Sequence, residues 1–347
     1  FVYMTDSHIM NQAYVDDARM CATAAAEYVP EARFCVFPGD FVETGTNRNS
    51  EWEWERWFDE ALRPVIQQMP IVPTDGNHDD SENLNYTYHF NTDNQFKENA
   101  HVKPQFDGTT YSFMYGDVLF MVYSLQDYWK GPYSLSTLTS TYLTNDVGNW
   151  FRDQVKAHPE AKWRIALVHK NIFSGSSHQE DEETPLFRAT MLPIIKECEI
   201  DLMLQGHDHC YEVIGPVNPD TQKPIKEAIE DLEPTVLSAS RNKGGTFTVN
   251  DGTLYFIGAT CGSKRYNPNS KTVMEADFDK HKVENYYDLF TGMFCQPGAP
   301  SYSTFTVDGN KITVNSYKVP KGKSPELFNT FYIKRTKDHS SQKSGKK

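Results

Sequence analysis

Five short apolar runs, each followed closely by Asp, Asn or His, constrain the fold of this chain more than any other feature. Their letters are FVYMTDSH, FCVFPGD, IVPTDGNHD, IALVHK and DLMLQGHDH. Runs that stay apolar at every position are typical of strands buried on both faces of a parallel sheet. Because open α/β sheets bind ligands in the loops at the carboxyl ends of their strands, we expect the polar clusters to form a site there.

Helix-like segments alternate with these runs. We expect helices over 11–28, 51–62, 146–157 and 187–198, and strands over 1–4, 32–37, 71–73, 163–168, 201–204 and 254–259. Residues 111–124 predict a hairpin that turns at Gly116-Asp117, and Asp308-Gly309-Asn310 predicts another between strands 303–307 and 312–319. The pattern indicates an α/β sandwich with parallel strands in its first half and more antiparallel strands toward its end.

The chain is long enough to bury a large core. It has 347 residues, of which 38% are hydrophobic, and its mean hydropathy is -0.62. We expect one domain over 1–333 and a disordered basic tail over 334–347. Two stretches, 212–253 and 268–300, look like insertions that either line a substrate cleft or form surface loops. The chain starts in a strand-like run without an initiator Met or a signal peptide, which indicates a trimmed N-terminus.

Charge and cysteine content exclude several classes of protein. The net charge is -13, so we expect no binding of duplex nucleic acid, and no apolar run is long enough to span a membrane. None of the six cysteines forms a CxxC pair, which argues against a zinc ribbon or a thioredoxin motif. Cys35 and Cys198 lie in apolar runs and read as buried thiols. Cys261 and Cys295 are the best disulfide candidates, with a bonded and a free state both open.

The aromatic and acidic clusters have plain structural interpretations. Helical spacing places part of EWEWERWF on one stripe, which predicts core packing for Trp54, Trp57, Phe58 and Ala61. The acidic run 180–183 reads as a solvated loop. Five further aromatic residues either stack on a substrate ring or form walls of a cleft: Tyr123, Tyr128, Trp129, Tyr211 and Tyr266.

The polar clusters consist of residue types that bind hard or borderline divalent metals. Asp6 and His8, like His207 and His209, are two residues apart, and in an extended segment such side chains point the same way. A lone histidine at a strand end is more often structural, but the joint spacing favours metal ligands here. A carboxylate with two oxygens can bridge two metals, which makes a dinuclear hydrolytic site the expected chemistry.

The order D-x-H, G-D, G-N-H-D, H and G-H-x-H, from Asp6 to His209, resembles the calcineurin-like metallophosphoesterase superfamily. The later stretch LYFIGATCGSKRY, followed by a terminal hairpin, is similar to the end of catalytic domains of the purple acid phosphatase type. The resemblance implies a four-layer α/β/β/α sandwich of two mixed sheets. It also implies two bound metal ions, with a hydroxide between them that attacks phosphorus.

Residue roles follow from the resemblance, position by position. It implies that the first metal is bound by Asp6, His8 and His209, the second by Asn77, His169 and His207, and both by Asp40. His78 would hydrogen-bond a phosphate oxygen or protonate the leaving group, and Asp79 would orient His78 by accepting its other N–H. His178, nine residues after His169, is either a substrate contact or an exposed loop histidine.

One position departs from the purple acid phosphatases. Their G-D-x-x-Y motif places a tyrosinate on iron, whereas this chain has Glu43 at that position and carries His8, which those enzymes usually lack. We therefore expect a colourless pair of Fe, Mn or Zn ions. The expected function is hydrolysis of small phosphate monoesters, with a phosphodiesterase or nucleotidase as the alternative. A non-catalytic scaffold is the third possibility, and the likeness to secreted phosphatases favours an exported protein.

Overall fold

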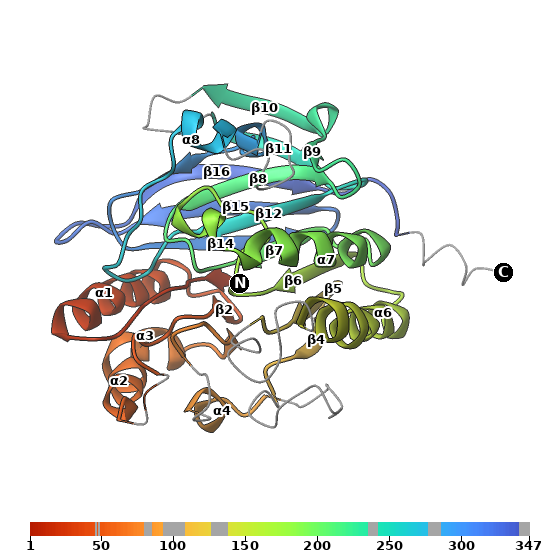
Figure 1. Ribbon diagram of the computed structural model, residues 1–347. Helices are drawn as coiled ribbons and strands as arrows, with labels where there is room; N and C mark the ends of the chain where they lie inside the picture. Colours follow the sequence, from red (N-terminus) through yellow and green to blue (C-terminus); the bar gives the residue numbers. More distant parts are fainter. Residues whose placement is uncertain are drawn as a thin grey trace.

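Two mixed β-sheets packed face to face, with helices on the outer faces, form the centre of the computed structural model (Figure 1). The structure describes residues 1–45, 47, 49–79, 85–92, 108–125, 138–234, 242–276 and 286–339. The described elements make four layers, as the sequence predicts: helices, sheet, sheet and helices.

The first sheet has the strand order β10-β11-β16-β15-β14-β1-β2-β3. Its strands are β1 Val2–Tyr3, β2 Cys35–Pro38, β3 Ile71–Thr74, β10 Ile229–Pro234, β11 Asn242–Thr248, β14 Ser301–Asp308, β15 Lys311–Lys318 and β16 Glu326–Lys334. Strands β1, β2 and β3 are parallel, and β14 joins β1 in antiparallel register, with Val2 opposite Thr304. The parallel half places the loops after β1, β2 and β3 at one edge of the sheet.

The second sheet has the order β13-β8-β12-β7-β6-β5-β4, with β9 paired to β8. Its strands are β4 Tyr111–Tyr115, β5 Val118–Val122, β6 Trp163–Leu167, β7 Leu202–Gln205, β8 Tyr211–Asn218, β9 Lys223–Pro224, β12 Thr253–Gly258 and β13 Phe294–Cys295. Strands β5, β6, β7 and β12 are parallel, so the loops after β6, β7 and β12 also share one edge.

Helices cover the outer face of each sheet (Figure 1). The first sheet carries α1 Gln12–Tyr28, α2 Glu51–Arg56, the π-helix η1 Trp57–Ala61 and α3 Arg63–Ile66, and the second carries η4 Leu138–Val147, α6 Gly148–Ala157 and α7 Glu183–Glu197. Shorter elements are α4 Asn85–His89, η5 Ser177–Glu180, η6 Lys226–Ala228, α8 Lys271–Ala276 and η7 Tyr286–Leu289. The Asn11 side chain caps α1 by accepting hydrogen bonds from the N–H groups of Ala13 and Tyr14.

Three apolar clusters fill the spaces between the layers. Residues from both sheets, including Val36, Phe120 and Phe256, form the central cluster, and each helical layer packs its own cluster against the neighbouring sheet. The expected tryptophan stripe is confirmed, because Trp54, Trp57 and Ala61 are fully buried and Phe58 packs against the same cluster. Tyr123 and Tyr211 are also core residues, so they do not stack on a substrate.

Most predicted elements are confirmed, and the errors have local causes. Both hairpins form as expected. The helix predicted over 51–62 changes to a π-helix at Trp57, and Pro64 lies in the first turn of the separate helix α3. Segment 212–253 is not an insertion, since β8 pairs with both β12 and β13 and its Tyr211–Val217 part is buried. Segment 268–300 likewise contains α8, η7 and β13.

The structure decides one open alternative and corrects one expectation. All six cysteines are buried free thiols, and Cys261 and Cys295 lie in different apolar clusters, so they form no disulfide. Residues 335–339 do not belong to a disordered tail, because Arg335 and His339 are buried and both bind the carboxylate of Asp201. Residues 340–347 lie outside the described residues.

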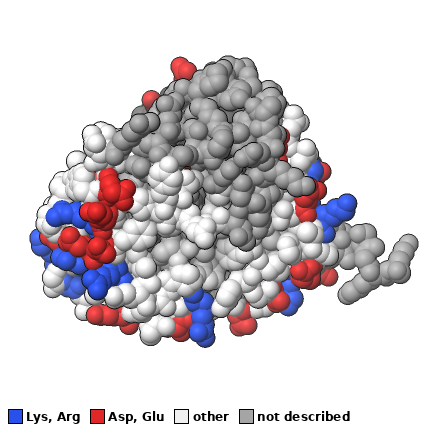
Figure 2. All heavy atoms as spheres, turned by 90° about the horizontal axis from the view of Figure 1, so that it is seen from below, with Lys and Arg blue, Asp and Glu red and all other residues white. Residues whose placement is uncertain are grey.

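Among the described residues, no helix has both the length and the apolar character needed to cross a bilayer. Figure 2 shows the molecule from below. On the coloured part of that face, Lys and Arg side chains alternate with Asp and Glu, so this part presents no continuous basic surface.

Candidate metal centre

The polar clusters of the apolar runs meet where the two sheets present the carboxyl ends of their parallel strands. Asp6 and His8 follow β1, Asp40 follows β2, and Asn77 and His78 follow β3. His169 follows β6, and His207 and His209 follow β7. Asn77 and His78 are half-buried, and the other six side chains are almost entirely buried. The structure thus brings together every predicted ligand from five separate loops.

The backbone at these residues is unusual. Four of the predicted ligands have positive φ: Asp6 at 55°, His8 at 47°, Asp40 at 53° and His207 at 70°. Few residues other than glycine adopt this left-handed region, and such strained conformations concentrate at functional sites. Asp6 and His8 therefore do not converge through an extended segment, as the sequence spacing suggested, but through two sharp turns. Hydrogen bonds from their N–H groups to the carbonyls of Gly39 and Asp40 hold these turns.

Glycines allow the loops to approach one another closely. A Cβ on Gly39 would lie 2.5 Å from Nδ1 of His169, and one on Gly76 would lie 2.2 Å from both N and Oδ1 of Asp40. Neither position has room for a side chain, and Gly39 also has a φ of 84°. The glycines in G-D and G-N-H-D are thus required by the packing of the site.

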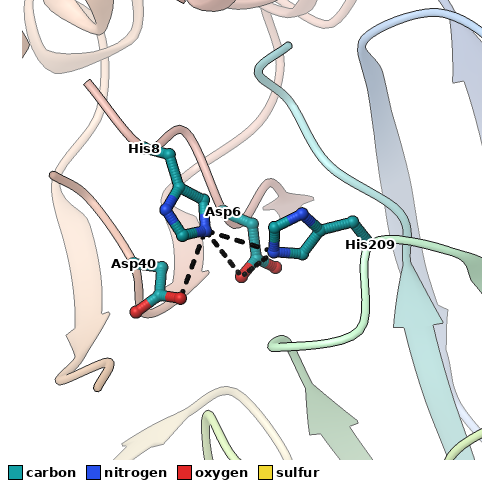
Figure 3. A group of neighbouring side chains, drawn as sticks. All are labelled: Asp6, His8, Asp40 and His209. Atoms are coloured by element: carbon teal, nitrogen blue, oxygen red, sulfur yellow. Dashed lines mark hydrogen bonds and ion pairs between the residues drawn. The ribbon is translucent and has the colours of Figure 1, made fainter. Parts of the chain in front are cut away.

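Asp6, His8, Asp40 and His209 form the first group of candidate ligands (Figure 3). Their side chains point toward one another, with Nε2 of His8 at the centre. This nitrogen lies 3.2 Å from Oδ2 of Asp40, 3.1 Å from Nε2 of His209 and 3.9 Å from Oδ1 of Asp6. Four side chains of the kind that bind borderline divalent metals thus face one small volume.

The second group shares Asp40 with the first. Asp40, His169 and His207 can place one ligand atom each around a common point. Nε2 of His169 lies 3.2 Å from the same Oδ2 of Asp40 and 3.1 Å from Oδ1 of Asn77. Asp40 therefore lies between the two groups, because its Oδ2 is 3.2 Å from His8 of the first and 3.2 Å from His169 of the second.

The hydrogen bonds of the imidazole rings test whether a cation fits. Each of three rings donates through Nδ1: His8 to Oε2 of Glu43 at 2.6 Å, His169 to the Pro38 carbonyl at 2.7 Å, and His209 to the Lys264 carbonyl at 2.8 Å. The Nε2 atom of each ring is therefore left to face carboxylate or amide oxygens or another imidazole nitrogen. All of these atoms carry lone pairs, so only a proton or a metal ion can lie between two of them. The donor set fits two metal ions.

The charges of the site favour a positively charged occupant. Burial would lower the pKa of His8 and of His169, but the neighbouring carboxylates, Asp40 above all, raise both to about 9. Burial would raise the pKa of Glu43, but the hydrogen bond from His8 and the nearby cations lower it to about 2. The site thus retains negative carboxylates and holds protons on two histidines where metal ions would otherwise bind.

Asp79 has a different environment from the one predicted. Its carboxylate accepts four backbone N–H bonds, from Gly76 and Asp40 to Oδ2 and from Phe41 and Val42 to Oδ1, at 2.7 to 3.2 Å. His78 instead donates through Nδ1 to the carbonyl of Glu43 at 2.7 Å. The prediction that Asp79 accepts the N–H of His78 is therefore wrong, and Asp79 joins the loops after β2 and β3.

His178 lies at the site rather than on an exposed loop. Its half-buried ring stacks on His207, with centroids 3.6 Å apart, and its Nδ1 donates to Oδ2 of Asp181 at 2.8 Å. The same carboxylate is 3.8 Å from Nε2 of His207. The acidic run 180–183 is consequently not uniformly solvated, since Glu183 also pairs with Lys170.

Sequence reasoning did not predict the contacts that support the candidate ligands. Glu43 was recognised only as the replacement for a tyrosine, yet it holds His8 through its side chain and His78 through its carbonyl. Lys264 and Tyr266 contact His209, although they are more than fifty residues away along the chain. Tyr266 is thus a wall of the site, whereas Tyr128 and Trp129 lie outside the described residues.

A model of the calcineurin-like phosphoesterase family matches residues 1–211, which include all of the predicted ligands. The chain belongs to this family. Its two mixed sheets match metallophosphoesterase structures, and its buried His and Asp groups are typical of a two-metal site.

Curated relatives match over shorter regions. An uncharacterized protein of Mycobacterium tuberculosis is 23% identical over 202 residues, which cover 55% of this chain and 37% of the relative. Purple acid phosphatase 3 of Arabidopsis thaliana is 39% identical over 82 residues, or 24% of this chain and 21% of the relative. The chain therefore spans well under half the length of these relatives.

Solved structures share the fold across almost the whole chain. A purple acid phosphatase from yellow lupin (Lupinus luteus) aligns with a TM-score of 0.61 and 13% identity over 98% of this chain and 54% of its own. GAP50, the anchor in the inner membrane complex of Plasmodium, aligns with a TM-score of 0.56 and 15% identity over 98% of this chain and 90% of its own. At such low identity, these similarities establish the fold alone.

Proposed function

We propose that this metallophosphoesterase binds two metal ions and hydrolyses phosphate monoesters. The position of Asp40 is the observation that carries this proposal. Its Oδ2 lies 3.2 Å from Nε2 of His8 and 3.2 Å from Nε2 of His169, as a carboxylate shared by two metal sites requires. The ligands specific to the first metal would be Asp6, His8 and His209, and those specific to the second would be Asn77, His169 and His207.

Two bound metal ions would activate a water molecule as the nucleophile and neutralise charge on the phosphoryl oxygens. His78 would assist the leaving group. Because its Nδ1 donates to the Glu43 carbonyl, Nε2 is the nitrogen available to a substrate, and a proton held there can pass to the departing oxygen. His178, beside the second group and held by Asp181, would bind a phosphate oxygen.

The ligand chemistry supports Fe, Mn or Zn rather than a ferric tyrosinate pair. Glu43 occupies the tyrosine position of purple acid phosphatases, but its carboxylate binds Nδ1 of His8 and Nζ of Lys264. The first metal would therefore receive a neutral imidazole from His8 at the place of an anionic phenolate. Elemental analysis of the purified protein identifies the metal directly.

The test of substrate class compares a monoester with a diester. Metal-loaded protein should hydrolyse p-nitrophenyl phosphate much faster than bis-p-nitrophenyl phosphate. A strong preference for the diester would replace the proposal with a phosphodiesterase, and selective cleavage of nucleotides with a nucleotidase. GAP50, described as an anchor, shares this fold, so the fold alone does not establish catalysis. Absence of hydrolysis of any phosphate ester by a two-metal form would favour a scaffold role.

The role of His78 has a separate test. The His78→Ala variant should keep both metal ions, because His78 is half-buried and its Nδ1 donates to a backbone carbonyl. Its kcat should fall about 10²- to 10⁴-fold, the usual contribution of a general acid. Loss of a metal ion from this variant would show that His78 is a ligand and not the acid.

We also propose export from the cell, which fractionation of the source organism would test.

A further inference from the structure

We infer that the loop 260–266, which follows β12, is a clamp that acts mainly on the first metal ion. This inference rests on the proposed two-metal site and goes beyond its ligand set. The loop lies outside the part of the chain that the family model matches, residues 1–211. Nevertheless, it contacts, directly or through one side chain, each of the three ligands that belong only to the first metal.

Thr260 and its neighbours hold the turn that carries Asp6. The buried hydroxyl of Thr260 donates to the Asp6 carbonyl at 2.6 Å and accepts the N–H of Gly262 at 2.9 Å. The N–H of Cys261 donates to the Thr5 carbonyl at 2.9 Å. Asp6 has a φ of 55°, so these bonds stabilise a backbone conformation that a free chain would rarely adopt.

Lys264 and Tyr266 hold the two histidines of the first group. The Lys264 carbonyl accepts the Nδ1–H of His209, and the Tyr266 ring stacks on His209 with centroids 4.2 Å apart and planes 6° apart. The Lys264 ammonium lies 3.3 Å from both carboxylate oxygens of Glu43, whose Oε2 in turn accepts the Nδ1–H of His8. The clamp therefore fixes which nitrogen each ring presents to the metal.

The ligands specific to the second metal have other supports. His169 donates to the Pro38 carbonyl, and His207 lies against His178 and Asp181. Within the described chain, no hydrogen bond joins the loop 260–266 directly to Asn77, His169 or His207. The loop reaches His207 only indirectly, through Asp6, whose Oδ1 accepts the His207 N–H at 3.1 Å, and through His178, whose ring centroid lies 5.7 Å from that of Tyr266. The asymmetry indicates that a change in the clamp weakens binding of the first metal and leaves the second nearly unchanged.

Thr260→Val tests the clamp, and Thr253→Val is its matched control. Thr253 lies in β12, Thr260 follows it, and both side chains are buried. Each hydroxyl donates to a backbone carbonyl, but the acceptor of Thr253 is Ile200, away from the site. Metal-free protein is titrated calorimetrically with Zn²⁺. The variants His209→Ala and Asn77→Ala assign the two binding steps, since each removes a ligand of one metal.

Thr260→Val should raise the Kd of the first step by about tenfold, the lower range for loss of a supporting bond around a metal ligand. The second step should stay within about twofold, and Thr253→Val should change neither. Tyr266→Leu, at a half-buried position, should also weaken the first step more than the second, because the Tyr266 ring stacks on His209 with centroids 4.2 Å apart and lies farther, 5.7 Å, from His178. Thermal unfolding of the metal-free proteins shows whether each variant is folded.

If folded Thr260→Val and Tyr266→Leu weakened both binding steps equally, or changed neither, the inference that the loop is a clamp would be refuted. Such results leave the proposed function intact as long as the wild type binds two metal ions. Binding of fewer than two by the wild type would instead contradict the two-metal site itself. The two failures are thus distinguished by the wild-type titration alone.

Discussion

Asp79→Asn separates two roles for a buried carboxylate that the sequence alone could not distinguish. In the structure, each oxygen of Asp79 accepts two backbone N–H bonds from the loops after β2 and β3. In the asparagine variant, one oxygen becomes an NH₂ group, so two of the four N–H donors lose an acceptor. Burial and the nearby charge of Asp40 raise the pKa of Asp79, but its four N–H donors stabilise the charged form, and hydrogen bonds to a charged group contribute about 1.5–3 kcal/mol each. The free energy of unfolding should therefore fall by about 3–6 kcal/mol.

Urea unfolding of the metal-free proteins measures this loss, and titration with Zn²⁺ measures metal binding. Because Asp79 fixes the loops that carry Asp40 and Asn77, both metal-binding steps should weaken along with stability. The opposite outcome is informative. If Asp79→Asn had wild-type stability and metal binding but lacked activity, Asp79 would act on the reaction through His78, and its assignment to loop anchoring would be wrong.

Three other predictions follow from single features of the site. Gly76→Ala should abolish binding of both metals, since its Cβ would overlap Asp40, and elemental analysis showing normal metal content would contradict this. Metal affinity should rise with pH up to about 9 and then level off, because the metal displaces protons from His8 and His169. Calorimetry in buffers of different ionisation enthalpy should detect that proton release at neutral pH, and an absence of release would refute it. Ala259→Gly should raise the free energy of unfolding by about 0–1 kcal/mol, since Ala259 has a φ of 63°, and a clear loss in urea unfolding would be the contrary result.

The sequence was sufficient to predict which polar side chains meet at the site and the layers of the fold. The candidate ligands are defined by their side-chain type and by their position after an apolar run, and both can be read directly from the sequence. The two hairpins were equally visible, because their turns are formed by short polar and glycine-containing segments. These features are local, so one sequence reveals them.

Features that depend on distant partners were not predictable. The left-handed turns at Asp6 and His8 are held by carbonyls of the next loop rather than by their own neighbours in sequence. Lys264 reaches Glu43 across 221 positions, and nothing near either residue indicates this pairing. Strand β8 was mistaken for an insertion because Gly215 and Pro216 interrupt its pattern, although pairing with β12 and β13 defines it as a strand.

The metal content of the purified wild-type protein tests the central claim most directly. Two groups of buried ligands share Asp40, so elemental analysis combined with Zn²⁺ titration should give two metal ions per chain. The two-metal form should hydrolyse p-nitrophenyl phosphate, and removal of the metals by a chelator should abolish the reaction reversibly. A protein that binds one metal ion or none, or that hydrolyses the ester equally well after chelation, would contradict the account.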